Sequence, residues 1–451
     1  MKKWACEKEA RQDILDSVAA YYQAYKKDDT GFHEGDRISY GGRVFDESEM
    51  CALVDSSLDF WLTAGRYTEE FEKRFAEIMG VRFASTVNSG SSANLIAFYA
   101  LTAPELKERA VLPGDEVITV AAAFPTTVSP IIQYGAVPVF LDVTIPQYNI
   151  DVSLLEEALS AKTKAVFIAH TLGNPFDLKT VRQFCDRHSL WLIEDTCDAL
   201  GGTYTIDGRD CMIGSIGDIG TASFYPAHHI TMGEGGCVFT NNALLHKLIR
   251  SYRDWGRDCI CSGGQDNFCG HRFDGQYGNL PRGYDHKYVY SHFGFNTKIT
   301  DMQAAIGCRQ LDKLPSFIEA RRHNWQYLKN GLQDMEDKLI LPEAAPDSDP
   351  SWFGFLITVK EGWNAVKIIR YMESKGVQTR RLFGGNLLKH PCFTETHRDY
   401  QWYRVVGELN NTDRIMRDTF WVGVYPGMTD EKMNYMIRIM KEAFEDSENR
   451  V

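Results

Sequence analysis

The sequence predicts an α/β protein, in which a large domain with a mostly parallel sheet is followed by a smaller α+β domain. Between residues 117 and 195, short apolar runs alternate with helical stretches, a pattern typical of a parallel sheet covered by helices on both faces. From about residue 310 this alternation gives way to a long helix and then to mixed strands and helices. At 451 residues the chain is long enough for two domains with their own cores.

Three regions are expected along the chain. Residues 1–35 form an N-terminal helical arm, because Gln12–Tyr22 has the spacing of an amphipathic surface helix. Residues 36–310 form the large domain, with strands expected at 117–120, 137–143, 165–169 and 191–195. Residues 311–451 form the small domain, with helices expected at 310–333, 365–375 and 430–445 and strands at 352–359 and 421–425. Parallel strands bring their carboxyl ends to one crevice, where α/β enzymes bind their ligands.

The composition indicates a cytoplasmic globular enzyme. Hydrophobic residues make up 44% of the chain and charged residues 24%, and the formal net charge is −12, which argues against nucleic-acid or membrane-surface partners. No apolar run of membrane-spanning length exists, and the two lysines near the N-terminus are not followed by the apolar core of a signal peptide. Eleven cysteines without a secretion signal indicate a reducing compartment.

The segment Ser223–Gly236 carries the most specific functional signal. It is similar to the loop that holds the cofactor lysine in the sugar aminotransferases of the DegT/DnrJ/EryC/StrS family, which use pyridoxal phosphate on nucleotide-linked keto sugars. Where that family has the lysine, this chain has His228. An imidazole can take a proton, but it has no primary amine and cannot form a Schiff base. The resemblance therefore implies a type I aminotransferase fold, a cofactor held without a covalent bond, and His228 as the catalytic base.

A second segment, Asn88–Ala97, reads as a glycine turn that opens into a helix. Backbone amides at a helix start favour a phosphate, although the same pattern also occurs as an ordinary helix cap. The resemblance implies that Gly90, Ser91 and Ser223 bind the cofactor phosphate. It also implies that Asp195 pairs with the pyridine nitrogen and keeps the ring an electron sink.

Three further residues are assigned through the same resemblance. Asp198 takes the place near the ring hydroxyl, and Phe124 takes the place of the aromatic side chain that stacks on the ring. Asn296 matches the segment by which relatives reach the phosphate of the neighbouring subunit, which implies a homodimer. A lone phenylalanine is more often part of a core, so the role of Phe124 depends on the resemblance alone.

The cysteines suggest a second cofactor. Cys259, Cys261 and Cys269 form a tight run, and Cys197 lies upstream, only two residues after Asp195. By themselves four thiolates are compatible with either an iron–sulfur cluster or a zinc site, and buried cysteines also occur simply as small hydrophobic residues.

Together with His228, this cysteine pattern resembles one branch of the family, the iron–sulfur sugar 3-dehydrases. The resemblance implies pyridoxamine phosphate (or its pyridoxal form) and a 2Fe–2S cluster held by Cys197, Cys259, Cys261 and Cys269. It implies C3 deoxygenation of CDP-4-keto-6-deoxyglucose or a related nucleotide sugar, in the synthesis of deoxysugars for lipopolysaccharide O-antigen. One departure is extra length near Tyr204–Cys211, which we expect to be a polar loop.

The expected reaction needs electrons from outside the chain. No glycine-rich dinucleotide fingerprint follows a strand, so an NAD(P)H-dependent iron–sulfur flavoprotein reductase or a ferredoxin should supply them. Arg380 and Arg381 suit a diphosphate, and His390 lies in the same stretch. His229 is either a second catalytic imidazole or a structural neighbour.

Three alternatives stay open at this point. A sister enzyme that acts on a TDP-linked sugar with ferredoxin as donor would carry the same motifs. A GDP-sugar 3-dehydratase would have the histidine but no cluster, and the four cysteines count against it. A catalytically silent aminotransferase relative is opposed by the presence of Asp195, the phosphate loop and the cysteine run.

Overall fold

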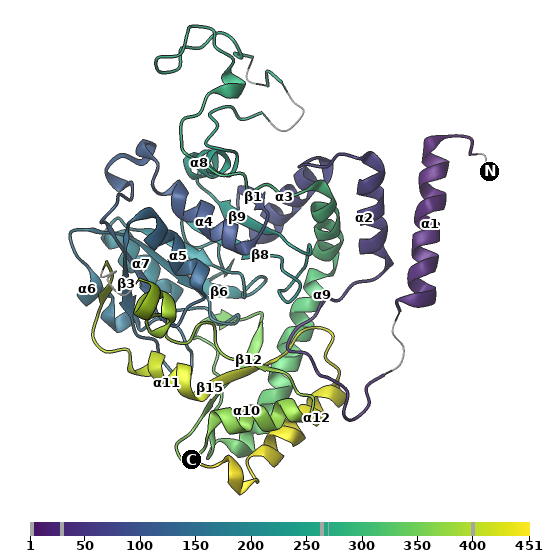
Figure 1. Cartoon of the computed structure of the whole chain (residues 1–451), viewed down its shortest axis with the longest axis vertical. Coiled ribbons are helices and arrows are strands. Elements are labelled where there is room, and N and C mark those ends of the chain that lie inside the picture. The colour runs from purple at the N-terminus through teal and green to yellow at the C-terminus, as the bar shows by residue number, and fades with distance from the viewer. Residues whose placement is uncertain (1–3, 28–30, 262–265, 269, 398–401) are drawn as a thin grey trace.

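The computed structural model describes residues 4–27, 31–261, 266–268, 270–397 and 402–451. Its centre is an eight-stranded sheet (Figure 1) whose strands, in spatial order, are β1 (Phe83–Val87), β9 (Gly236–Thr240), β8 (Ile219–Ser223), β5 (Trp191–Asp195), β4 (Thr163–Ala169), β2 (Glu116–Val120), β3 (Val137–Leu141) and β14 (Arg404–Val405). The strands run parallel from β8 to β14, and β9 is antiparallel to both of its neighbours. The predicted mostly parallel sheet is confirmed.

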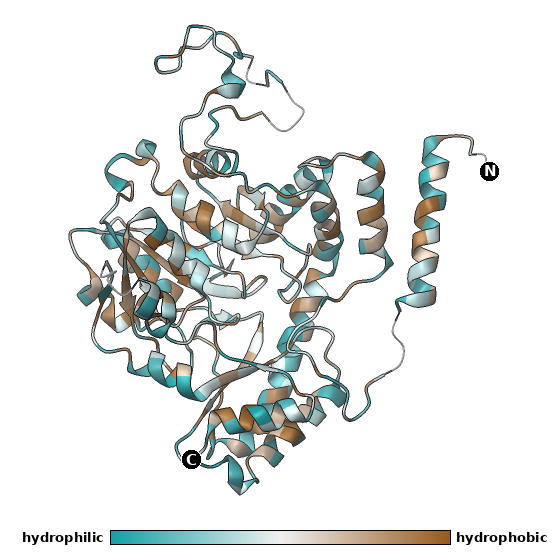
Figure 2. Ribbon diagram, viewed as in Figure 1, coloured by the Kyte–Doolittle hydropathy of each residue, from teal (hydrophilic) through white to brown (hydrophobic). Residues whose placement is uncertain are grey.

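Helices pack on this sheet and are begun and ended by local signals. They include α4 (Gly90–Ala100), α5 (Pro125–Tyr134), α6 (Leu155–Ala158), α7 (Leu178–Arg187) and α8 (Ala243–Arg253). The Ser89 hydroxyl accepts from the Ser92 amide at the start of α4, and α5 starts at a proline and ends at Gly135 with φ 91°. Figure 2 shows the hydrophobic residues gathered on the strands and on the inward faces of the helices. The core is thus built on the sheet, which leaves the strand ends free to carry polar side chains.

A second, antiparallel sheet forms the C-terminal part of the molecule. Its strands, in spatial order, are β10 (Leu339–Ile340), β12 (Gly354–Val359), β15 (Thr419–Gly423) and β13 (Thr379–Arg380). The helices of this part are α10 (Ala365–Ser374), α11 (Asn410–Asp418) and α12 (Asp430–Ala443). These elements lie close to their expected positions.

The long helix α9 (Asp301–Leu332) begins earlier than the sequence pattern suggested. The expected start was Gln310, but the Gln303 side chain accepts from the Thr300 amide at 2.8 Å and forms a capping box that starts the helix at Asp301. The expected boundary between residues 310 and 311 therefore falls inside α9, which runs from the large sheet to the small one (Figure 1).

The segment expected to be a polar loop near Tyr204–Cys211 is a β-hairpin. Strands β6 (Thr203–Ile206) and β7 (Arg209–Met212) pair antiparallel, and β6 also pairs with β11 (Ser348–Asp349). Asp207 and Gly208 both have positive φ, as a two-residue hairpin turn requires. The expectation of a loop was wrong because this Asp-Gly pair is a hairpin signal.

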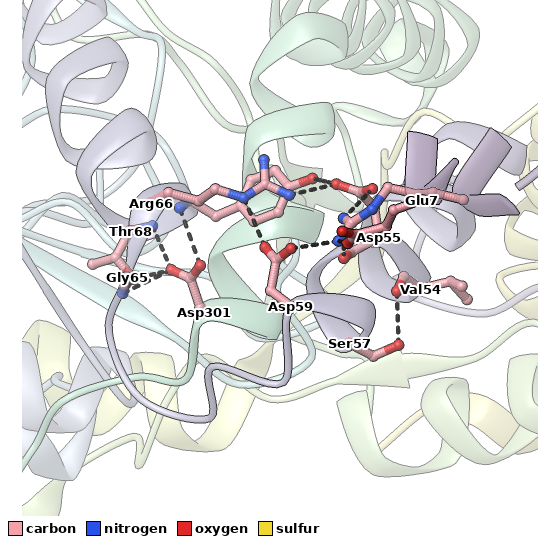
Figure 3. A network of polar contacts seen from close by, with 11 residues as sticks. Glu7, Val54, Asp55, Ser57, Asp59, Gly65, Arg66, Thr68 and Asp301 are labelled. Atoms are coloured by element: carbon pink, nitrogen blue, oxygen red, sulfur yellow. Dashed lines mark hydrogen bonds and ion pairs between the residues drawn. The ribbon is translucent and has the colours of Figure 1, made fainter. Parts of the chain in front are cut away.

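The N-terminal arm forms a single helix, α1 (Glu7–Tyr25), in which no residue is buried. It lies beside α2 (Glu47–Asp59), and α3 (Arg66–Met79) follows (Figure 1). Figure 3 shows the polar network between them. Nη1 of Arg11 donates to Asp55 and Nη2 to Asp59, both at 2.7 Å, and Arg66 donates to the same two carboxylates. This network ties α1 to α2 and α3.

Between α8 and α9 the chain makes a long excursion away from the sheet, seen at the top of Figure 1. Several of its aromatic side chains are exposed, and these are Trp255, Phe268, Phe273, Tyr284, Tyr288, Tyr290 and Phe293. Among the described helices, none combines the length and apolar character needed to cross a lipid bilayer.

Candidate active site

A cavity of about 530 Å³ lies between the large sheet and the small one. Its inner wall comes from the start of α4, the end of β5 and the turn after β8. Its outer wall comes from Tyr40 and from the C-terminal part of the chain, with Phe353, Arg380, Arg381, Phe383 and Trp421. Gly90, Ser91, Phe124, Asp195, Cys197, Asp198, Ser223 and His228 all line this cavity. Most of the residues singled out in the sequence are thus brought to one place.

Asp195 is buried at the carboxyl end of β5, and its carboxylate is held by three donors. Oδ2 accepts from Nδ2 of Asn94 and from Oγ1 of Thr127, each at 2.8 Å, and Oδ1 accepts from the Cys197 amide at 3.1 Å. Donors of this kind fix the direction in which the carboxylate points. Sequence reasoning missed Asn94 and Thr127, although Asn94 lies one helical turn after Gly90 on the same helix.

The start of α4 approaches the ends of β8 and β9 more closely than any side chain would allow. A Cβ atom on Gly90 would lie 2.4 Å from Cβ of Ser223, and one on Gly236 would lie 2.4 Å from the Ser89 carbonyl oxygen. The absence of these Cβ atoms lets Ser223 and the Ser89 carbonyl pack directly against the two glycines, and Ser91 and Ser223 line the cavity beside the first amides of the helix. The site has the form of a phosphate cradle at a helix N-terminus. With Asp195 opposite it, this donor set fits a pyridoxal-type cofactor.

His228 lies on the turn after β8, and its ring faces the cavity. Nδ1 lies 3.3 Å from Oδ1 of Asp198, within ion-pair distance but without the alignment of a hydrogen bond. The ring stacks on Phe353 with a centroid distance of 5.2 Å and an interplanar angle of 30°. Burial raises the pKa of Asp198, and the neighbouring His228 opposes that rise. Because Nδ1 faces Asp198, Nε2 is the ring nitrogen left for chemistry in the cavity.

The open question about His229 is answered by its contacts. Its side chain is buried, and Nε2 donates to the Ser351 carbonyl at 2.9 Å. Burial lowers the pKa of His229 well below its ordinary value, and the positive charge of Arg321 lowers it further. By these contacts His229 is a structural neighbour of His228.

The two adjacent arginines occupy different environments. The Arg380 guanidinium lies over the Tyr40 ring, 4.0 Å from its centroid, at the outer wall. Nη1 of Arg381 instead donates to the carbonyls of Arg417 and Thr419, both at 3.1 Å. Burial lowers the pKa of Arg381, which Asp418 opposes. Nη1 of Arg380 also donates to a carbonyl, that of Thr379 at 2.8 Å, but Arg380 is exposed whereas Arg381 is half-buried. Of the pair, Arg380 is therefore more accessible to an anion.

Two assigned residues lie away from this cavity. Oδ1 of Asn296 accepts from Nζ of Lys298 at 2.7 Å, and its backbone pairs with Asp254 at the base of the excursion. His390 donates from Nε2 to the Gly384 carbonyl at 2.6 Å. Neither residue is part of the lining of its own chain's cavity.

The cysteines are divided between two places. Cys197 lines the main cavity, whereas Cys259 and Cys261 line a separate small cavity on the excursion, with Asn267 and Arg272. The Cys261 amide donates to Sγ of Cys259 at 3.5 Å. Cys269 lies outside the described residues. Within the described ranges no three His, Cys, Asp or Glu side chains converge as metal ligands, so Cys197 does not meet the other two there.

Several residues that shape the site were not predicted from the sequence. Thr126 and Tyr225 line the cavity, and Phe353 and Trp421 close it from the small sheet. Arg321 does not line it, but its guanidinium donates to the main chain at His228. Tyr225 lies within the segment Ser223–Gly236 and Thr126 lies two residues after Phe124, so both could have been found from the sequence. No local motif marks Phe353, Trp421 and Arg321, because they come from distant parts of the chain.

Comparison with known proteins places this geometry in a family. The chain is 57% identical over 405 residues to the lipopolysaccharide biosynthesis protein RfbH of Salmonella typhimurium. These residues make up 89% of this chain and 91% of that protein. It is 46% identical over 437 residues to dTDP-4-dehydro-2,6-dideoxy-D-glucose 3-dehydratase of Saccharopolyspora spinosa, covering 96% of this chain and 92% of that protein.

Solved structures agree with these sequence matches. The Escherichia coli GDP-4-keto-6-deoxy-D-mannose-3-dehydratase with bound hydrated PLP superposes with a TM-score of 0.79 at 27% identity, covering 90% of this chain and all of that one. The type I aminotransferase fold is thereby confirmed. Residues 45–441 match the sequence model of the DegT/DnrJ/EryC1/StrS aminotransferase family. The chain belongs to the DegT/DnrJ/EryC1/StrS aminotransferase family.

Proposed function

We propose that this protein is a nucleotide-sugar 3-dehydrase that removes the C3 hydroxyl of a CDP-linked 4-keto-6-deoxy sugar, in the synthesis of lipopolysaccharide deoxysugars. The observation that carries the proposal is His228 in the cofactor cavity, at the position where aminotransferases of the family have lysine. The relatives add support: RfbH is a lipopolysaccharide biosynthesis protein, and the relative at 46% identity is a 3-dehydratase.

The cavity fits pyridoxamine phosphate. Asp195 would hold the pyridine nitrogen, the cradle at Gly90, Ser91 and Ser223 would hold the phosphate, and Phe124 would cover the ring. Asp198 is assigned to the ring hydroxyl or to His228, and its 3.3 Å contact favours His228. When bound, the cofactor supplies an amine that condenses with the keto group and a ring that accepts electrons.

The side chains of the protein contribute proton transfer and positioning. His228 takes a proton through Nε2, while Asp198 faces Nδ1 and favours the tautomer that leaves Nε2 unprotonated. Phe353 fixes the plane of the imidazole by stacking on it. A positioned base of this kind contributes about 10²–10⁴ in rate. Arg380 is assigned to the diphosphate of the substrate.

We also infer a 2Fe–2S cluster held by Cys197, Cys259, Cys261 and Cys269, with electrons from an iron–sulfur flavoprotein reductase or a ferredoxin. The support is the cysteine spacing and the position of Cys197 beside Asp195. The described residues supply one close pair, Cys259 and Cys261, rather than an assembled set.

The working form is proposed to be a cytoplasmic homodimer, in which Asn296 contributes to the phosphate site of the neighbouring subunit. The support is Asn296 lying outside its own cavity, together with exposed apolar residues on the excursion and after α2, among them Phe60, Trp61 and Phe293. Covering such side chains with a second copy removes apolar surface from water.

The decisive experiment is an anaerobic assay of the purified protein with CDP- and TDP-linked 4-keto-6-deoxyglucose, pyridoxamine phosphate and a chemical or protein reductant. Turnover of the CDP sugar supports the proposal. Preference for the TDP sugar would favour the second candidate, which the relative at 46% identity supports. The assay also includes the GDP-linked sugar. Turnover of that sugar without iron, with glutamate added to regenerate the cofactor, would indicate a cluster-free GDP-type enzyme. No turnover with any sugar would indicate a silent relative and would overturn the proposal.

A further inference from the structure

A buried arginine joins the turn that carries His228 to the segment that leads into β12. Arg321 lies on α9 and is 1% exposed. Its Nη2 donates to the carbonyl oxygen of His228, and its Nη1 donates to the carbonyl oxygen of Trp352, both at 3.1 Å. One guanidinium thus links the main chain of His228 to the segment that leads into β12, an inner strand of the small sheet.

This arginine has no acidic partner at contact distance. Within the part of the chain that the structure describes, no carboxylate lies within ion-pair range of Arg321, and its Nε has no hydrogen-bond partner. Burial lowers the pKa of Arg321 to about 9, which the more distant Asp198 opposes. A buried cation without a counter-ion is unfavourable for stability. Charge pairing therefore does not explain why an arginine is buried at this position, whereas its hydrogen bonds to the two carbonyl groups do.

The segment held by Arg321 also fixes the ring of the base. Phe353 follows Trp352 directly and stacks on the His228 imidazole, and its amide donates to the Leu172 carbonyl at 2.8 Å. The Arg321 guanidinium lies 5.8 Å from the centre of the same Phe353 ring. The main chain and the ring of His228 are thus both held against the segment Trp352–Phe353. Arg321 contacts the His228 carbonyl, the Trp352 carbonyl and the Phe353 ring.

We propose that Arg321 is a positioning residue for His228, which sets the distance of the base from the cofactor by tying its turn to the small sheet. The proposal rests on the proposed function, in that His228 is the base. A misplacement of about 1 Å at a reacting group costs about 10²-fold in rate, so a contact of this kind affects turnover without touching the substrate.

The neighbouring arginine provides a matched control. Arg322 lies on the same helix and donates from Nε to the Pro350 carbonyl at 3.1 Å and from Nη2 to the Asp349 carbonyl at 3.0 Å. It contacts the same segment but makes no contact with His228, and it forms an ion pair with Asp349. Its loss should loosen the segment without releasing the base.

The test compares Arg321→Ala, Arg321→Lys, Arg322→Ala and His228→Asn in the full-length protein loaded with cofactor. For Arg321→Ala we expect kcat to fall about 10- to 100-fold with KM changed less than about threefold, since the lost contact is to the base. Guanidinium chloride at non-denaturing concentration should restore part of kcat. In cofactor-free protein, amide exchange of the peptide around His228 should be faster in Arg321→Ala than in Arg322→Ala.

Two results would overturn the inference. One is equal kcat and equal exchange in the two alanine variants. The other is a loss in Arg321→Ala that matches only the fraction of folded protein, without rescue by guanidinium. If Arg321→Ala does not fold, Arg321→Lys and Arg322→Lys are compared by the same criteria. Full activity in His228→Asn would instead contradict the proposed function, so the two failures are distinguishable.

Discussion

Nδ1 of His228 lies 3.3 Å from Oδ1 of Asp198 at the floor of the cavity, and both side chains are largely withdrawn from water. The carboxylate comes from the chain just after β5, and the imidazole comes from the turn after β8. In a buried environment such a pair fixes which nitrogen carries the proton, because only Nδ1 faces the negative charge. We therefore expect a neutral His228 to carry its proton on Nδ1.

Replacing Asp198 should therefore slow the reaction while leaving the cofactor bound. For Asp198→Asn we expect kcat to fall about 10- to 100-fold. This loss is smaller than that expected for removing the general base itself, because the His228 ring keeps its place against Phe353. Steady-state kinetics and a cofactor titration measure the two effects. Asp142→Asn is the control, since that buried carboxylate caps α11 through the Thr412 amide at 2.8 Å. Unchanged kcat in Asp198→Asn would contradict the assignment.

Replacing His228 itself separates the base from the binding site. His228→Asn should lose about 10²–10⁴ in kcat and still bind pyridoxamine phosphate. His228→Lys restores a primary amine at the family's lysine position, so borohydride treatment with pyridoxal phosphate should attach the cofactor to this residue, as mass spectrometry of the peptide would show. Attachment at another lysine would argue that residue 228 does not face the cofactor.

The phosphate cradle depends on a missing Cβ atom. In Gly90→Ala the new methyl group would meet Cβ of Ser223 at 2.4 Å, which is too close for any real contact. We expect the affinity for pyridoxamine phosphate to fall more than about tenfold, because overpacking moves the helix start by a few tenths of an ångström or more. Calorimetry measures the loss. No change in affinity would place the phosphate elsewhere.

The cluster proposal predicts a specific metal content. Protein prepared anaerobically should contain about two irons and two labile sulfides for each chain, and Cys→Ser changes at Cys197, Cys259, Cys261 or Cys269 should remove them. The exposed Cys392 serves as the control, since its change to Ser should keep the iron. Binding of pyridoxamine phosphate should survive in Cys259→Ser, because that residue lies outside the main cavity. Zinc in place of iron would refute the cluster.

The polar network at α1 predicts a loss of anchoring in acid. Although burial opposes it, hydrogen bonds from Tyr67, Arg11 and Arg66 lower the pKa of Asp55 to about 2, against an ordinary value of 3.8. A carboxyl group with a lowered pKa in the folded state stabilises that state above pH of about 4, and the contribution is lost as the pH falls towards about 2.

Arg11→Ala should therefore release α1 already at neutral pH, whereas wild-type protein should release it only in acid. Limited proteolysis between α1 and α2 measures the release, and Lys8→Ala, an exposed change on the same helix, is the control. Activity for each folded chain should stay within about twofold, because α1 contributes no residue to the cavity lining. Equal proteolysis of Arg11→Ala and wild type would show that apolar contacts hold the helix.

The sequence alone determined four neighbouring strands of the large sheet (β2 to β5), the loss of the cofactor lysine at His228 and the place of Asp195 at a strand end. These features are local: period and composition show which face is buried, and the family motif fixes a residue by its neighbours in the chain. The hairpin at Asp207-Gly208 was also local, and its turn signal could have been read.

The tertiary structure decided which side chains meet. Asn94 and Thr127 hold Asp195 from 101 and 68 residues away, and Arg321 holds the carbonyl of His228 from 93 residues away. It also showed that both arginines line the cavity while donating to backbone carbonyls, Arg380 to that of Thr379 and Arg381 to those of Arg417 and Thr419. A hydrophobic period tells which face of a helix is buried, but it does not say which atoms of another element that face will contact. The partners of a buried polar group are fixed only when the elements pack, because its hydrogen bonds need atoms at particular distances.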